Sequence, residues 1–382
     1  MMCDGIKGMV PKDKMCAGAR KLRNVYEGTP DAPFFQQEFG FYCLDRWKKE
    51  GLPTDKTLDE IFGYDESGCH TLNGLGWCTP EFMPMFEEKV LEDRGEHEVA
   101  QDFAGRHVLY FKGRREGFMP EYIDHPVKDM YSWEKNCKWR LNPKSKERYI
   151  DFDKQIIEAK EAAKTGKIIS QRVVGGFMYL RSLIGPTDLL YKFYDAPDLI
   201  HECMEAWLTL ADTVISKYQE HITLDELYIG EDICYNHGPL ISPDMIQAFL
   251  FPYYQQLLTN TKKRQIDKKR HLFFNVDTDG NALPVIPLYQ TLGMDVMNPF
   301  EVASGCDVVK IGKQYPELIM SGGIDKRVLA AGKEAIDRHL DYILPTMKKR
   351  GGYIPTCDHG VPEEVSLENY LYFRKRCLEY AY

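Results

Sequence analysis

Short apolar runs, each followed by a longer helical stretch, repeat through the chain from residue 151 onward. This alternation is typical of parallel β–α–β units. The predicted strands are 168–174, 224–230, 271–277, 295–301, 318–324 and 352–358. The predicted helices are 178–194, 196–221, 243–263, 283–292, 308–315, 333–349 and 367–381. Five such units in series fit either a closed barrel or a doubly wound sheet.

The doubly wound alternative lacks its usual sequence signature. No G-x-G-x-x-G follows an early strand, no P-loop is present, and Gly175–Gly176 alone is a weak turn signal. We therefore favour an α/β fold of the (β/α)8 (TIM) barrel type.

The first part of the chain has a different pattern. Residues 1–75 are predicted to be helix and loop, and 86–111 to form an antiparallel β-hairpin that leaves the main fold. The regular β/α repeats occupy 151–382. We expect all three parts to form one domain over residues 1–382.

Composition narrows the functional classes. A hydrophobic content of 43% with 28% charged residues is that of a globular protein. No apolar run reaches the roughly 18 to 20 residues of a membrane span, and the first residues lack a signal peptide's apolar block, so we expect a cytoplasmic protein without a membrane partner. Eleven irregularly spaced cysteines indicate reduced thiols. A net charge of −9 argues against a nucleic-acid partner.

Acidic residues gather at the ends of the predicted strands. Glu231 and Asp232 follow one strand, and Glu301 ends another. Asp277 and Asp279 are two residues apart, so in extended backbone both would face the same side and could act on one ion or one substrate group. Strand ends share one rim in a parallel barrel, where reacting groups usually lie. Each acid has a structural alternative as a helix N-cap.

His359 is the only histidine at a predicted strand end, and it follows Asp358. A histidine at this rim is a candidate general acid or metal ligand. We therefore expect it to act with the acidic residues.

Four segments resemble the uroporphyrinogen decarboxylase superfamily in order and spacing. They are GEDICYNHGPLISPDMIQAFLFPYYQQLL (230–258), VDTDGNALPVIPLYQTLGMDVMNPFE (276–301), SGGIDKRVL (321–329) and GGYIPTCDHGVPEEVSLENY (351–370). The resemblance implies a (β/α)8 barrel with a deep cleft, often present as a homodimer.

The superfamily has two main activities. Its true decarboxylases carry an early R-Q-A-G-R-Y motif whose arginines hold substrate carboxylates. The corresponding text here is QEFGFY (37–42), with Gln37 and Phe41 where the arginines stand. A substrate with eight carboxylates needs such cationic anchors, so the resemblance argues against uroporphyrinogen decarboxylation.

The second activity is that of corrinoid-dependent methyltransferases, whose thiol-methylating members bind zinc through H-x-C and a later Cys. In this chain Asp277 and Asp279 hold the H-x-C positions, and His359 holds the position of the later Cys. Carboxylates and an imidazole form a harder ligand set than thiolates. The resemblance therefore points to an oxygen-containing methyl donor.

The function we expect is O-demethylation, in which a methyl group moves from a methyl ether, such as a methoxylated aromatic, to the Co(I) of a partner corrinoid (cobalamin) protein. The departing oxygen needs coordination or a proton. A divalent ion such as zinc, held by Asp277, Asp279 and His359 with Glu301 as a further ligand, would supply the first. His359 or an acidic group with a raised pKa, with Glu231 and Asp232 as further catalytic candidates, would supply the second.

The substrate pocket is expected to use Phe41 and Tyr42 from an aromatic cluster that could equally be core, and Tyr235 beside the acidic pair. Arg114 lies in a basic patch that either holds a ring carboxylate or faces solvent. Two alternatives to methyl transfer remain: a decarboxylase-like carboxy-lyase, and a non-catalytic corrinoid- or porphyrin-binding protein.

Overall fold

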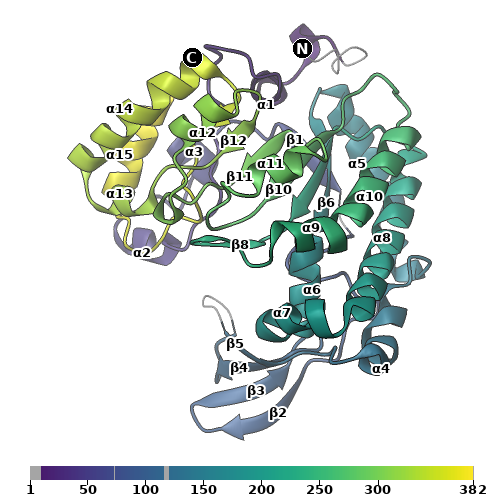
Figure 1. The fold of residues 1–382 in the computed structure, drawn as a ribbon. Coiled ribbons are helices and arrows are strands. Elements are labelled where there is room, and N and C mark those ends of the chain that lie inside the picture. Colours follow the sequence, from purple (N-terminus) through teal and green to yellow (C-terminus); the bar gives the residue numbers. More distant parts are fainter. Residues whose placement is uncertain (1–9, 73, 116–119, 382) are drawn as a thin grey trace.

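A curled parallel sheet organises the molecule (Figure 1). The computed structural model describes residues 10–72, 74–115 and 120–381. Seven strands of the described residues pair in parallel, in the order β1-β6-β7-β10-β11-β12-β13. Their bounds are β1 Cys69–Leu72, β6 Ile168–Val174, β7 Glu226–Gly230, β10 Phe273–Asp277, β11 Val296–Asn298, β12 Ile319–Ser321 and β13 Tyr353–Ile354. The expected parallel α/β architecture is present, with seven strands in the described part of the chain where a full barrel has eight.

Helices cover the outside of this sheet (Figure 1). The N-terminal helices are α1 Ala17–Tyr26, α2 Leu44–Lys49 and α3 Leu58–Phe62. Those of the repeats are α5 Phe152–Lys164, α6 Gly176–Ile184, α7 Pro186–Asp195, α8 Pro197–Gln219, α9 Pro243–Phe249, α10 Phe251–Arg264, α11 Ile286–Gln290, α12 Val308–Gln314, α13 Lys326–Ala330, α14 Lys333–Arg350 and α15 Leu367–Leu378. The helix predicted at 178–194 is divided because Gly185 has a φ of 99° and Pro186 begins a new helix.

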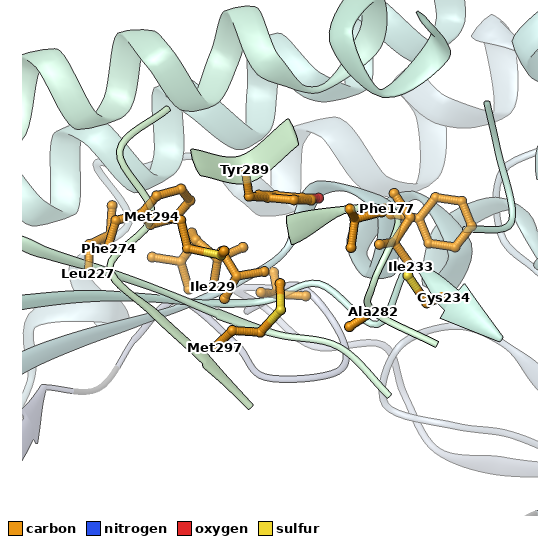
Figure 2. Packing of buried hydrophobic residues seen from close by; sticks show 14 of the residues in the cluster. Phe177, Leu227, Ile229, Ile233, Cys234, Phe274, Ala282, Tyr289, Met294 and Met297 are labelled. Carbon is orange, nitrogen blue, oxygen red and sulfur yellow. The ribbon is translucent and has the colours of Figure 1, made fainter. Parts of the chain in front are cut away.

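The outer face of the sheet carries the main hydrophobic core. Figure 2 shows Leu227 and Ile229 of β7 packed with Phe274 of β10 and Met297 of β11. Alternate residues of a strand point to opposite faces. The residues that alternate with these four along their own strands therefore face the lumen, the space enclosed by the curled sheet. Each strand therefore contributes one side to the core and the other to the interior.

The amino ends of the strands are closed by a separate apolar cluster. It consists of Leu22, Val25, Phe35, Ile168, Phe273, Val296, Ile319 and Ile354. Helix α1 supplies the first two of these side chains. The lumen is thus sealed at one end by hydrophobic contacts.

The gap between the two edge strands is bridged by the extended chain before β1. The Asp65 amide donates to the Gln36 carbonyl near β1, at 2.9 Å. The Cys357 amide, just after β13, donates to the Glu38 carboxylate at 2.9 Å. This segment therefore connects both edges of the sheet. Strand β1 itself falls inside the segment predicted to be helix and loop, because CHTL is too short and too polar to predict a strand.

The hairpin predicted at 86–111 is part of a larger antiparallel sheet. Four strands make it: β2 Lys89–Arg94, β3 His97–Gln101, β4 His107–Phe111 and β5 Glu121–Asp124. A short helix, α4 Met130–Ser132, follows. Figure 1 places this sheet at the opposite end of the molecule from α1. Within the described residues, no helix is long and apolar enough to cross a membrane.

Candidate active site

A polar network fills the lumen above the apolar cluster. The Ser170 hydroxyl donates to Glu226 at 2.6 Å, and the Asn275 amide donates to the same carboxylate at 3.0 Å. The Asn298 amide in turn donates to Asn275 at 2.9 Å. Buried polar groups are stable when they are hydrogen-bonded. This network runs through the lumen from Glu226, the first residue of β7, to Asn298, the last residue of β11.

Asp277, the last residue of β10, lies at the top of this network. The Tyr228 hydroxyl donates to its Oδ2 at 2.5 Å. Burial raises the pKa of Asp277 to about 7, against the lowering effect of Tyr228, and the nearby Asp279 raises it further. A carboxyl group with this pKa carries a proton in a substantial fraction of molecules at neutral pH.

His359 and Asp279 meet at the rim. His359 Nε2 lies 3.6 Å from Asp279 Oδ2, and the two side chains are 27% and 37% exposed. The interaction with Asp279 raises the pKa of His359, although burial acts in the opposite direction. Tyr42 stacks on the imidazole at 5.9 Å, and Phe39 lies 5.4 Å from it. His359 is therefore a partly exposed imidazole whose pKa lies above its usual value.

Two further rim acids are neutralised by basic partners. Asp232 accepts from Arg181 at 2.5 Å, and Glu301 accepts from Lys326 at 2.9 Å. Burial raises the pKa of Asp232 despite this arginine. Both acids are placed as the sequence predicts, but each has a cation of its own.

Glu231 points away from the lumen. It is fully buried, and its carboxylate accepts from the Phe177 amide at 2.9 Å and from the Tyr254 hydroxyl. Burial raises its pKa to about 7. Asp232 has a φ of 43°, in the left-handed region, so the chain turns sharply between the two acids. Glu231 therefore fixes the start of α6 behind the sheet and does not reach substrate.

The expected metal ligands do not form a ligand set. Among the described residues, no three His, Cys, Asp or Glu side chains are placed to hold a metal ion. Strand β10 ends at Asp277, so the alternation that would put Asp279 on the same face does not continue. Asp277 and Glu301 each hydrogen-bond another side chain, and only Asp279 approaches His359. This arrangement of side chains does not fit an ion.

Not all of the predicted substrate-binding residues lie at the site. Tyr42 is 62% exposed and covers His359. Phe41 instead packs edge-on against Trp47 and Tyr370, so it belongs to the core. Tyr235, in the hairpin formed by β8 Cys234–Tyr235 and β9 Gly238–Pro239, is 46% exposed.

A cavity of about 680 Å³ opens beside the strand ends, between the antiparallel sheet and helices α6 and α7. Asp232 and Arg181 form part of its wall, whereas Arg114 does not line it. Its size and apolar character suit a small ring compound. The apolar side chains that line it include Trp77, Phe82, Met85, Phe103, Tyr122 and Met178.

The sequence did not single out Trp77 or Arg172. Trp77 follows β1, a strand that was not predicted. Arg172 is the one charged residue of β6, which the sequence predicts as a buried strand and not as part of the site. Ser170 and Arg172 are polar residues two positions apart in a buried strand, so both face the same side of the sheet. This spacing is the signal that would have identified Arg172.

Comparison with known proteins gives a family and a fold. The sequence profile described as uroporphyrinogen decarboxylase (URO-D) matches residues 143–380. A uroporphyrinogen decarboxylase from Hydrogenobaculum sp. (strain Y04AAS1) is 27% identical over 70 residues, 18% of this chain and 20% of that protein. The chain thus matches about a fifth of the length of this curated relative.

Among solved structures, a methyltransferase from Methanosarcina mazei is similar over 96% of this chain and 99% of its own, with a TM-score of 0.60 and 14% identity. At this identity the likeness shows the fold. It confirms the predicted barrel-type α/β architecture, and it places the fold of this chain beside that of a methyltransferase.

Proposed function

This chain belongs to the uroporphyrinogen decarboxylase (URO-D) family, and on that basis we propose that it transfers a methyl group from a methyl ether to the Co(I) of a corrinoid protein. The methyl donor is a methoxylated aromatic compound. The observation that carries the proposal is the His359–Asp279 pair, a proton donor at the carboxyl ends of the strands. The structural likeness to a methyltransferase supports it at the level of fold.

The chemical difficulty is the leaving group. When the corrinoid accepts the methyl carbon, the C–O bond breaks, its electron pair stays on oxygen, and an unprotonated phenolate or alkoxide is a poor leaving group. His359 donates the proton that this oxygen needs. Its Nε2 faces Asp279, and Nδ1, which makes no hydrogen bond within the described part of the chain, is the nitrogen we assign as donor. General-acid help of this kind contributes about 10²- to 10⁴-fold.

The other groups hold the substrate. The aromatic wall around Trp77 accepts the ring. We assign Asp277, with a pKa of about 7, as a second protonated group for the departing oxygen. Tyr42 shields the imidazole from one side. The partner corrinoid protein and the homodimer expected from the family resemblance are parts of this proposal.

Decarboxylation of uroporphyrinogen is the less favourable alternative. Gln37 and Phe41 stand where the decarboxylases carry arginines, and Phe41 is packed among core rings. Neither position supplies a cation for the substrate carboxylates.

Methyl transfer is tested with free cob(I)alamin as acceptor, by absorbance, together with chromatography of the phenol product. We expect 3-methoxybenzoate to react with the wild-type protein and His359→Ala to lower the rate by about 10²- to 10⁴-fold. A panel of methoxylated rings that gives no transfer would overturn the proposal.

A leaving-group series then tests the role of His359. A cyano group beside the ether, as in 3-cyano-4-methoxybenzoate, yields a phenolate that departs more readily without protonation. The fold reduction in the methyl-transfer rate of His359→Ala relative to wild type should therefore be smaller with this substrate than with 4-methoxybenzoate. An equal deficit with both ethers would show that His359 does not donate the proton.

A further inference from the structure

Arg172 projects into the lumen near the carboxyl end of β6. It lies two residues after Ser170, whose side chain joins the lumen network, so both residues face the same side of the strand. Although the residues on either side of it are buried, Arg172 is exposed. A ligand that enters from the strand ends can therefore reach its guanidinium group.

Two aromatic rings hold this guanidinium in place. Its central carbon lies 4.6 Å from the Trp77 ring centroid and 4.9 Å from that of Tyr228. The Trp77 and Tyr228 rings are themselves 5.6 Å apart. An arginine supported by aromatic rings keeps its N–H donors available to a planar anion and loses little freedom when it binds one.

The charges at the strand ends leave Arg172 without an acidic partner. Asp232 pairs with Arg181, Asp279 with His359 and Glu301 with Lys326. Arg172 has no ion pair or side-chain hydrogen bond with any described residue.

The two lumen acids near Arg172 are engaged elsewhere. Glu226 accepts from Ser170 and Asn275, and Asp277 accepts from Tyr228. Burial also raises the pKa of Asp277 to about 7, so its charge is incomplete at neutral pH. Arg172 acts on Asp277 through its charge, but no carboxylate of the described residues contacts its guanidinium, so its N–H donors are open to an anion.

We propose that Arg172 binds a carboxylate on the substrate ring, so that the substrate class is a methoxylated aromatic carboxylate. This assignment rests on the proposed function and replaces Arg114 as the carboxylate anchor. Trp77 contacts Arg172 and also lines the cavity, so a ring held in the cavity can place a carboxylate on Arg172. A single guanidinium balances one carboxylate, whereas a phosphate dianion needs more positive charge than these residues offer.

Binding of unreactive probes tests the anchor. Benzoate and benzamide have the same shape and differ in charge, and their affinities can be measured by calorimetry with Trp fluorescence as a second signal. We expect wild type to prefer benzoate. Arg172→Gln should weaken benzoate binding about 10- to 100-fold and leave benzamide binding unchanged. The benzoate affinity of Arg172→Lys should lie between those of wild type and Arg172→Gln, because lysine keeps the charge and loses the bidentate geometry.

A matched control is Arg338→Gln, on the outside of the molecule in α14, where the arginine side chain is 74% exposed. It should bind both probes as wild type does. Circular dichroism of the Arg172 variants checks that they are folded. The proposal is overturned if Arg172→Gln binds benzoate as wild type does, if both probes weaken equally, or if phenyl phosphate binds more tightly than benzoate.

Failure of the anchor and failure of methyl transfer give different results. Benzoate has no methyl group, so its binding does not depend on the reaction. Arg172-dependent benzoate binding without methyl transfer would keep the anchor and reject the proposed function. If Arg172→Gln transfers the methyl group of 3-methoxybenzoate as fast as wild type, the proposed function stands and the anchor is rejected.

Discussion

The two faces of the parallel sheet differ in chemistry although the same strands form both. On β10, Phe274 and Val276 face the helices and are fully buried in the core, whereas Asn275 and Asp277 face the lumen and hydrogen-bond there. Period-two alternation separates the two roles residue by residue. On this strand the outer face therefore provides stability, and the inner face provides polar groups of the candidate site.

The largest expected effect is on stability, from the outer face. Phe274→Ala removes a fully buried ring and should lower the free energy of unfolding by about 3–5 kcal/mol. Denaturant titration measures it, and the folded fraction should still bind benzoate. His359→Ala is the inner-face counterpart and should change stability little, since its side chain is partly exposed. Equal destabilisation by both variants would break the distinction.

Asp277 and Glu231 sharpen the comparison, because burial raises the pKa of each to about 7 and they lie on opposite sides of the sheet. An unfolded carboxyl group titrates near 4. Each native group therefore holds its proton up to higher pH than the unfolded chain does. The stability that it contributes is present below about pH 4 and is lost as the pH rises through about 7.

Asp277→Asn and Glu231→Gln should each remove this loss. Between pH 5 and pH 7, each variant should gain stability relative to wild type by up to about 1.4 kcal/mol per pH unit. Unfolding titrations at several pH values measure the slope. Only Asp277→Asn should also alter the pH dependence of methyl transfer. If Glu231→Gln alters it equally, the outer face takes part in the reaction.

A smaller effect is expected at the rim. Asp279→Asn removes the carboxylate that raises the pKa of His359, so the imidazolium is lost at lower pH. The alkaline limb of the pH–rate profile should move to lower pH, whereas the acid limb should stay at its wild-type position. An alkaline limb at its wild-type position would separate Asp279 from His359.

The smallest effect concerns Arg172 and Asp277. The Arg172 charge lowers the pKa of Asp277, so Arg172→Gln should move that pKa upward. Infrared or NMR titration of the carboxyl group, with Arg338→Gln as control, measures the direction. A downward shift would show that Arg172 does not act on Asp277 through its charge.

The repeats were predictable from sequence because each strand is an apolar run followed by an amphipathic helix. Strand β6 has the predicted bounds, 168–174. Strand β1 was missed, since its pairing with β6 depends on contacts nearly a hundred residues away. The antiparallel sheet was recognised only as a hairpin because the connection from β4 to β5, residues 112–120, is longer than the loop of a typical hairpin.

The candidate site was less predictable. The sequence placed Asp232, Asp277, Asp279, Glu301 and His359 near one rim, but it did not say which way each side chain turns. Glu231 and Asp232 are neighbours and point to opposite sides of the sheet, because the backbone of the second is left-handed. The direction of each side chain and its hydrogen-bond partner depend on tertiary packing, which neighbouring residues in the sequence do not determine.

One labelled reaction tests the central claim most directly. The substrate is 3-methoxybenzoate carrying ¹³C in its methoxy carbon and in its carboxyl carbon, with cob(I)alamin as acceptor and methyl iodide as the positive control for the acceptor. The account predicts that the methoxy label moves to the corrinoid in step with phenol release, while the carboxyl label stays on the ring. A methoxy label that remains on the ring, or a carboxyl label that leaves as carbon dioxide, would contradict it.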